Sequence, residues 1–352
     1  MSVTYYTYKA KDVRAWIENG AKNGLSEQII SLTRANALLH CPYVKDKDVL
    51  VVSAMDGEKV VGYTAIFPEK LERPDMWIAT GTTLCVNPDY PDDFVGYNLV
   101  QRLWQAYPNC AVIGSDVAKP AALIDKLLGA KICKYERSDF VFNRKIQVRS
   151  IRNFGSLLLE PFRKHRQQKA IKRVLATIPN NIRVIARYMI DAEAYEFIKA
   201  HSGQDTFLRS REMLNWILRY PFFAENQLLH RAQKHNEFSD QARSYRYQLQ
   251  QVYADDALIG IVLYGLRGRD IHVKMLYIDD AHCEVVYALI VEAITNYHAE
   301  QLWSIYPELN AYIESKQVAL RDSRCPLLFT YPKLLKDLEP IVLQGMDGDM
   351  FA

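Results

Sequence analysis

The sequence predicts an α/β (α+β) fold of two similar units, each a mixed, mostly antiparallel sheet flanked by helices. The first observation behind this prediction is a hairpin pattern, in which two alternating apolar runs are joined at Asp56-Gly57. The second is the return of this pattern at Tyr247–Gly268, where Gly260 stands 198 residues after Gly62. The third is that strand and helix patterns follow both hairpins in the same order, which indicates duplication of one unit.

The first unit is expected to begin with a strand, two helices and the hairpin. Alternation over Ser2–Lys9 favours a strand, whereas helical spacing of apolar residues marks Asp12–Gly20 and Ser26–Leu39. The hairpin strands are Val49–Ala54 and Lys59–Phe67. The elements expected after the hairpin are a strand at Met76–Val86, a helix at Val95–Tyr107, a strand at Cys110–Gly114, a helix at Lys119–Leu128 and a strand at Ile132–Asn143.

The second unit repeats this alternation of strands and helices. Its expected elements are a strand at Ile182–Tyr188, helices at Ala192–His201 and within Leu208–Phe223, the hairpin, a strand at Ile271–Ile278, a helix at Glu284–Tyr297, a strand at Leu302–Tyr306 and a helix at Ala311–Ser315. We therefore expect an N-terminal domain at 1–146, a basic helical linker at 147–177 and a C-terminal domain at 178–352.

The expected linker is strongly basic. Between Arg149 and Arg173 there are eight lysines and arginines against one acid, Glu160, and Pro161 is well placed to open a helix. One interpretation is a solvated helix that bridges the domains. The other is a surface for an anionic partner, such as membrane headgroups, a nucleotide-sugar or RNA.

Composition limits the classes of protein that this chain can represent. With 352 residues, 49% hydrophobic and 24% charged, it resembles a soluble globular protein of two domains. A net charge of +3 argues against a nucleic-acid partner, and no apolar run is long enough for a transmembrane segment. The six cysteines are scattered without a CxxC pair, and the N-terminus has no apolar signal-peptide core. We therefore expect a cytoplasmic protein; the sequence indicates no oligomeric state.

Three stretches carry a resemblance to a known family. The sequences DGEKVVGYTAIF, CVNP and GYNLVQRLW, all between Asp56 and Trp104, resemble the hairpin, fourth strand and acyl-CoA loop of the GNAT acyltransferase superfamily. The stretch Val112–Phe142 is similar to that family's closing strand, helix and hairpin. The second half resembles tandem GNAT proteins in outline, through Trp216, Arg219, Tyr220 and Pro221.

This resemblance implies a reaction and a set of residues. The cosubstrate would be acetyl-CoA or another acyl-CoA, and the acceptor a small amine such as an amino sugar. The residues implied to polarise the thioester carbonyl through backbone N–H groups are Leu84, Cys85 and Val86. Those implied to hold the CoA pyrophosphate in the same way, at the start of a helix, are Phe94, Val95, Gly96 and Tyr97.

The sequence departs from the family pattern in the phosphate loop. Of the family's Gln/Arg-x-x-Gly-x-Gly/Ala loop, residues 91–96 keep only Gly96, and Asp92 and Asp93 stand where an anion would lie. We therefore expect weak or absent CoA binding unless these carboxylates turn away. The corresponding loop of the second unit, Asp279–Glu284, has no glycine and is expected not to bind CoA in the usual way.

Two acids are implied as catalytic residues. Asp125 lies four residues before Gly129, where the family often has a tyrosine as general acid, and Asp116 falls where it commonly has asparagine. A carboxyl group is a poor acid for a thiolate unless its pKa is raised. No glutamate lies on Met76–Val86 to act as a base.

No metal site is expected. Histidine, cysteine and acidic residues gather near Asp279–Glu284, but they are sequence neighbours without paired ligand spacing.

Three functions remain open on the sequence alone. The first is an acyl-CoA-dependent N-acyltransferase, and the second a non-catalytic binding or regulatory protein built on two degenerate GNAT domains. The third is a Fem-type transferase that takes its acyl group from a charged tRNA, with Arg149–Arg173 facing the RNA. CoA binding separates the first from the others, and a steep salt dependence of RNA binding favours the third.

Overall fold

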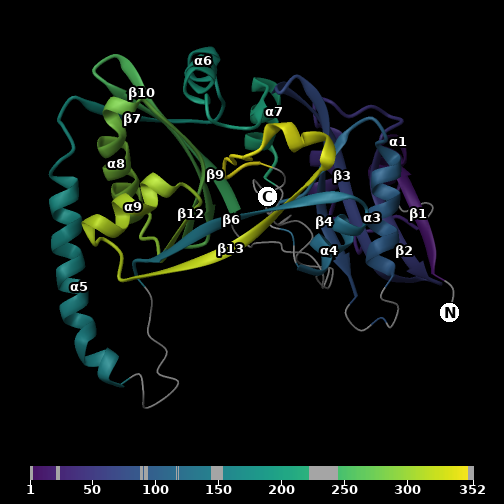
Figure 1. The fold of residues 1–352 in the computed structure, drawn as a ribbon, viewed down its shortest axis with the longest axis horizontal. Helices are drawn as coiled ribbons and strands as arrows, with labels where there is room; N and C mark the ends of the chain where they lie inside the picture. The colour runs from purple at the N-terminus through teal and green to yellow at the C-terminus, as the bar shows by residue number, and fades with distance from the viewer. Residues whose placement is uncertain are drawn as a thin grey trace. The chain divides into compact units, whose positions relative to one another are not determined.

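The computed structural model describes residues 3–20, 24–87, 90, 94–115, 117, 119–143, 154–221 and 245–347. The chain divides into two compact units that interleave in sequence (Figure 1). Unit 1 comprises Met1–Tyr135, Gln204–Tyr245 and Leu327–Ala352, and unit 2 comprises Glu136–Gly203 and Arg246–Pro326.

The sheet of unit 1 is antiparallel except at one edge. Its strands follow the order β1-β2-β3-β4-β5, and β8 pairs with β3. Pairing is antiparallel from β1 to β4 and parallel between β4 and β5. The strands are β1 (Thr4–Lys9), β2 (Val49–Asp56), β3 (Lys59–Arg73), β4 (Met76–Val86), β5 (Ala111–Ile113) and β8 (Leu208–Arg209).

Helices flank this sheet. They are α1 (Ala10–Asn19), α2 (Leu32–Leu39), α3 (Val95–Ala106), α4 (Lys119–Leu127) and α7 (Arg211–Arg219). Helix α3 turns Val95, Leu99 and Leu103 into a core shared with β2, β3 and β4, as its apolar spacing predicts. Helix α2 begins later than expected, because the Ser31 hydroxyl accepts the N–H of Arg34 and caps the helix at Leu32 rather than at Ser26.

The second sheet has seven strands in the order β13-β6-β12-β11-β10-β9-β7. Its strands are β6 (Ala130–Val141), β7 (Ile182–Arg187), β9 (Tyr245–Ala254), β10 (Ala257–Arg267), β11 (Asp270–Ile278), β12 (Gln301–Ser304) and β13 (Arg321–Pro332). Both β6 and β13 run from residues of one unit into residues of the other. The remaining elements are α5 (Phe154–Leu175), α6 (Ala192–His201), η2 (Asp280–His282), α8 (Cys283–Asn296), α9 (Pro307–Lys316) and η3 (Lys333–Leu338).

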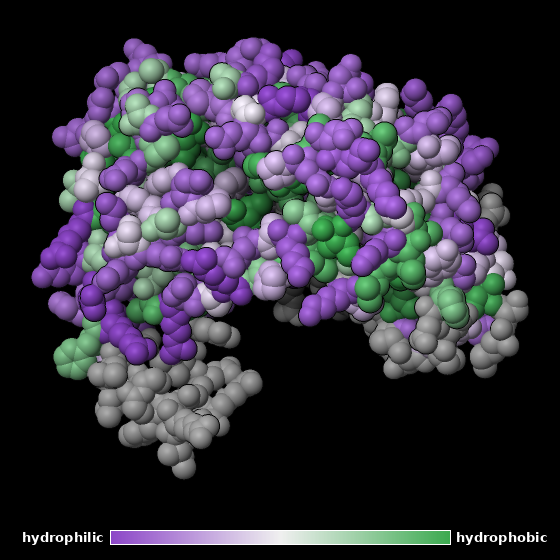
Figure 2. Space-filling model, viewed as in Figure 1, coloured by the Kyte–Doolittle hydropathy of each residue, from purple (hydrophilic) through white to green (hydrophobic). Residues whose placement is uncertain are grey.

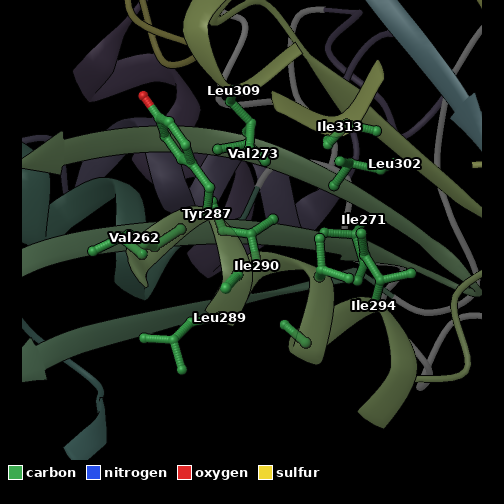
Figure 3. Close-up of a cluster of buried hydrophobic side chains, with 14 of the residues drawn as sticks. Val262, Ile271, Val273, Tyr287, Leu289, Ile290, Ile294, Leu302, Leu309 and Ile313 are labelled. Atoms are coloured by element: carbon green, nitrogen blue, oxygen red, sulfur yellow. The ribbon is translucent and has the colours of Figure 1, made fainter. Parts of the chain in front are cut away.

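Unit 2 contains the larger core. Helix α8 is apolar on nearly all sides and packs between the sheet and its neighbouring helices. Figure 3 shows the buried side chains of this core, including Val262, Ile271 and Val273 from the sheet, Tyr287, Ile290 and Ile294 from α8, and Leu309 and Ile313 from α9.

The two hairpin glycines occupy the same structural position in the two units. A Cβ added at Gly62 would lie 3.0 Å from the carbonyl oxygen of Cys85 and 3.1 Å from Val95 of α3. One added at Gly260 would lie 2.9 Å from Val286 of α8 and 3.6 Å from the carbonyl oxygen of Tyr277. Each glycine therefore lets a helix approach the hairpin closely, which agrees with the expected duplication.

The chain's last segment packs in unit 1. Phe329, Tyr331 and Leu335 share a core with Ile78 of β4 and Phe207. Helix α7 also packs in unit 1, because the Trp216 indole N–H donates to the carbonyl oxygen of Ala37 at 2.8 Å. The sequence placed this helix in the second unit, since its pattern carries no information about the residues it contacts.

The basic segment is a regular helix of unit 2. Helix α5 begins at Phe154 and contains Pro161, which does not open it as expected. Its Val174 lies in the unit 2 core, and the Gln167 side-chain amide donates to two backbone oxygens of that unit.

The fold class is confirmed, with two mostly antiparallel sheets flanked by helices. The contiguous boundaries 1–146, 147–177 and 178–352 stay a prediction, beside compact units that are discontinuous in sequence.

Candidate active site

The strands β4 and β5 of unit 1 separate halfway along β4. Their parallel ladder joins Ile78, Ala79 and Thr80 to Ala111, Val112 and Ile113 and extends no further in the part of the chain that the structure describes. The next residue after β5, Gly114, instead exchanges backbone hydrogen bonds with Thr330 of β13, at 3.0 and 2.8 Å. Among the described residues, the second half of β4 therefore lacks β5 as a neighbour on that edge.

This same half of β4 carries a bulge. Tyr63 pairs with Cys85, but Ala65 pairs with Thr82, so Thr83 and Leu84 together oppose a single residue of β3. Thr83 has a φ of 56°, a left-handed conformation that is uncommon for a β-branched residue. A bulge reorients the backbone groups beside it and is frequent next to active sites.

A buried arginine supports the bulge. The Arg34 guanidinium, on α2, donates to the hydroxyl of Thr83, and this hydroxyl lies 3.1 Å from that of Thr82. Nothing in the sequence around Arg34 predicts this role. No local pattern could have revealed it, because the two partners are 49 residues apart.

The predicted phosphate loop leads into the N-terminus of α3. Phe94 has helical φ and ψ, and its side chain does not cap the helix. Val95 and Gly96 are buried, and a Cβ at Gly96 would lie 3.2 Å from Ile124 of α4 and 3.5 Å from Val86. Gly96 therefore allows α3 to pack closely against α4 and the end of β4, and it brings the N-terminus of α3 next to Val86.

The implied site residues thus fall into two groups. Leu84, Cys85 and Val86 lie at the end of β4, and Phe94, Val95, Gly96 and Tyr97 lie at the start of α3, with Val86 and Gly96 in contact range. Asp92, Asp93 and Asp116 lie outside the described residues.

Asp125 is a largely buried acid on α4. Its Oδ2 accepts a hydrogen bond of 2.7 Å from the hydroxyl of Thr330, the residue that pairs with Gly114. Desolvation raises the pKa of Asp125 from 3.8 to about 6, and the Thr330 hydrogen bond opposes this shift. The carboxyl group can therefore exchange a proton near neutral pH. Thr330 itself was not predicted, since it lies 205 residues from its partner.

The equivalent region of unit 2 also has diverging strands and a bulge, but a tyrosine side chain hydrogen-bonds to the strand there. Strands β11 and β12 pair at three positions only, ending with His272 and Trp303. Beyond them, the Tyr306 hydroxyl donates to the carbonyl oxygen of Lys274 at 3.1 Å. In the turn before α8, Asp279 accepts the N–H of Ala281 at 2.9 Å, so this backbone donor is already satisfied.

No metal centre is formed by the described residues. Within them, no group of three or more His, Cys, Asp or Glu side chains is placed to hold an ion. His272 is buried and stacked on Trp303, with ring centroids 3.9 Å apart, and burial lowers its pKa well below the usual value.

Among the described residues, no helix combines the length and apolar character that crossing a membrane requires.

Comparison with known proteins supports the fold rather than a specific activity. No protein-family model matches the chain, and no curated protein matches it. Among solved structures, a tandem GNAT protein from the clavulanic acid biosynthesis pathway is 12% identical, with a TM-score of 0.51 over 94% of this chain and 98% of that one. A GCN5-related N-acetyltransferase from Anabaena variabilis is 8% identical, with a TM-score of 0.51 over 94% of this chain and 72% of that one.

A third similar structure is a GCN5-related N-acetyltransferase from Kribbella flavida, which is 12% identical. It has a TM-score of 0.50, and the similarity covers 94% of this chain and 70% of that one. The chain therefore has the fold of the tandem GNAT proteins, and the expected resemblance is confirmed at the level of the fold.

Proposed function

We propose that this protein is an acyl-CoA-dependent N-acyltransferase whose active site lies in unit 1. The observation that carries the proposal is the contrast between the two units at the diverging strands. Both β4 and β11 carry a bulge beyond the parallel ladder, but in unit 2 the Tyr306 hydroxyl donates to the carbonyl oxygen of the bulged residue Lys274. One unit would thus hold the thioester, and the other would complete the fold.

The residues at the end of β4 and the start of α3 are suited to holding acyl-CoA. Backbone N–H groups near Leu84 and Cys85 would polarise the thioester carbonyl, because a bulge turns such groups out of the ladder. The N-terminus of α3, from Phe94 to Tyr97, would hold the pyrophosphate through its first N–H groups. Acyl-CoA supplies the activated acyl group.

The transfer requires one bond to form and one to break. The amine nitrogen attacks the thioester carbon, the C–N bond forms, the C–S bond breaks, and CoA leaves as a thiolate. The nitrogen gives up one proton and the thiolate takes one. We assign this proton transfer to Asp125, whose pKa of about 6 leaves it mostly ionised at pH 7 and able to accept the amine proton. Asp116 is the second candidate for this role.

The proposal also includes a class of acceptor and a cellular location. We infer a small-molecule amine, with amino sugars as the first class to test, by analogy with other proteins of this fold. We also infer a cytoplasmic location, which is consistent with six free cysteines.

Isothermal titration with CoA and acetyl-CoA, followed by a free-thiol assay with a panel of amines, tests the proposal. We expect CoA to bind, and we expect this binding to weaken when residues of the unit 1 site are substituted. We also expect the release of free thiol with at least one amine. The matched control is Asp280→Asn in unit 2, which should change neither measurement. Absence of CoA binding in both the wild type and the Asp92→Asn/Asp93→Asn variant would refute the proposal.

A second function is favoured by one observation in the sequence. Asp92 and Asp93 precede α3, and two carboxylates there oppose a pyrophosphate. A protein that has lost CoA binding would be a binding or regulatory protein built on two GNAT domains. The same titration distinguishes it, because restoring CoA binding by removing the two charges without any thiol release would favour this second function.

A further inference from the structure

Helix α5 presents a basic face that no described part of the chain neutralises. Its inner face is set by Gln167, Ile171 and Val174, which pack against or hydrogen-bond to unit 2. The residues on the opposite face recur every three or four positions and are all exposed. We call this set the basic face of α5; it consists of Phe162, His165, Lys169, Lys172 and Arg173.

The charges of this face lack internal partners. Within the described ranges, Lys169, Lys172 and Arg173 take part in no ion pair, although other surface cations of the chain do. Arg166 donates to the side chain of Gln317 rather than to an acid. Figure 2 shows mainly hydrophilic residues over α5 at the left edge of the view. The helix therefore carries several positive charges on one exposed face.

One exposed aromatic residue accompanies these charges. The Phe162 residue is 75% exposed, although a phenylalanine in water loses the free energy that burial would provide. A helix face that combines lysines and arginines with an exposed phenylalanine is typical of a segment that lies in the headgroup region of a membrane. The phenylalanine enters the apolar boundary, while the cations contact anionic headgroups.

We propose that α5 docks this protein on a membrane surface that contains anionic lipid. A bilayer fits the face better than RNA does, because the cations lie on one exposed helix face together with an exposed phenylalanine. Single-stranded RNA is usually held in a groove by several stacked aromatic side chains, and this face has only one. The docking is peripheral, and it is separate from the proposed acyl-transfer site, which uses unit 1 residues alone.

The test uses the full chain and two kinds of vesicle. One is phosphatidylcholine alone, and the other is phosphatidylcholine mixed with phosphatidylglycerol. In a co-sedimentation assay at about 0.15 M salt, we expect binding only to the anionic vesicles, and stronger binding at lower salt. Equal binding to both vesicles, or to neither at low salt, would overturn the proposal.

The variant Lys169→Ala/Lys172→Ala/Arg173→Ala removes three cations from the basic face while keeping good helix-forming residues. Each cation near an anionic surface contributes about 1 kcal/mol, or about fivefold in affinity, so the triple variant should bind about 100-fold more weakly. Phe162→Ala should cause a smaller loss that persists at high salt, because it removes an apolar contact.

The matched control, Lys11→Ala/Lys59→Ala/Lys333→Ala, removes the same charge from exposed positions outside α5. It should retain nearly full binding, and an equal loss would show that net charge alone is responsible. Circular dichroism and thermal unfolding confirm that both variants fold. A single-stranded RNA serves as a further probe. If RNA binds through α5 while anionic vesicles do not, the proposal is wrong and the tRNA-dependent alternative gains support.

Discussion

The Nε atom of Arg209 lies 2.7 Å from the Oε1 atom of Glu69, and both side chains are almost completely buried. The same guanidinium donates to the backbone oxygen of Met346 at 2.6 Å and lies 3.3 Å from Oδ1 of Asp347. Arg209 therefore connects β3 and β8 to the C-terminal segment of unit 1. The other Glu69 oxygen, Oε2, is buried with no hydrogen-bond partner among the described residues. One cation thus serves two buried carboxylates.

Replacing the shared cation should destabilise the protein strongly. Arg209→Leu leaves Glu69 and Asp347 buried without a counter-charge, and we expect a loss of about 3–5 kcal/mol in the free energy of unfolding at pH 7. The control is Arg324→Leu, which removes an exposed partner of Glu136 and Glu314 and should cost far less, because solvent screens an exposed ion pair. Urea unfolding measures both, and similar losses would contradict the assignment.

The pH dependence of stability should reflect Asp347. Burial raises the pKa of Asp347 from 3.8 to about 7, although Arg209 opposes the shift. Because this pKa is higher in the folded state than in the unfolded chain, the contribution of the protonated Asp347 to the free energy of unfolding is complete below pH 4. This contribution is lost as the pH rises toward 7. Relative to wild type, Asp347→Asn should therefore gain up to about 4 kcal/mol between pH 4 and pH 8. A difference that is constant across this range would show that Asp347 stays ionised.

Asp125→Asn should separate stability from activity. The Asp125 carboxyl group has a pKa of about 6 in the folded protein, so its ionisation destabilises the folded wild type as the pH rises from about 4 to 6. The variant should therefore gain about 1–3 kcal/mol in the free energy of unfolding relative to wild type above pH 7. In the acyl-transfer assay it should lose about 10²–10⁴-fold in kcat/KM, and the acidic limb near pH 6 should disappear. An unchanged pH–rate profile would exclude Asp125 as the proton-transfer residue.

Gly62→Ala should test the close approach of α3 to the hairpin. The new Cβ would lie 3.0 Å from the backbone oxygen of Cys85, which cannot move as a flexible side chain does. We expect a loss of about 1–3 kcal/mol in the free energy of unfolding. Gly203→Ala is the control, since nothing lies within 4 Å of its added Cβ, and it should be neutral or stabilise by up to about 1 kcal/mol.

The two loop acids should weaken CoA binding. At an effective dielectric near 20, a charge pair about 6 Å apart costs roughly 3 kcal/mol, about a hundredfold in affinity. A helix N-terminus contributes only about 0.3–2 kcal/mol in return. Asp92→Asn/Asp93→Asn should therefore bind CoA more tightly than wild type in a calorimetric titration. Asp279→Asn/Asp280→Asn, with the same charge change in unit 2, should have no effect. Micromolar affinity that the first variant leaves unchanged would show that the acids point away.

Local patterns were sufficient for most of the secondary structure. The hairpins around Asp56-Gly57 and Asp255-Asp256 form as expected, because turn chemistry and alternation act between near neighbours. The spacing also identified Gly62 and Gly260 as equivalent positions, and each proved to be a point of close helix packing. The position of Val86 beside Gly96 followed from the order of strand, loop and helix.

Helix boundaries depended on contacts that periodicity does not contain. The predicted linker at 147–177 contains α5, whose inner face packs in unit 2, where the Gln167 side chain donates to two backbone oxygens. Pro161 lies inside the helix rather than at its start. A basic composition describes the exposed face of a helix and says nothing of the apolar residues on its other side.

By itself, the sequence determined most of the strand and helix order and the duplication. These features arise from interactions between residues that are close along the chain. Only the tertiary structure decided that Arg209 meets Glu69, 140 residues away, and that Thr330 meets Asp125, 205 residues away. It also decided the raised pKa values of Asp125 and Asp347, since desolvation depends on the whole surroundings of a carboxyl group and not on its sequence neighbours.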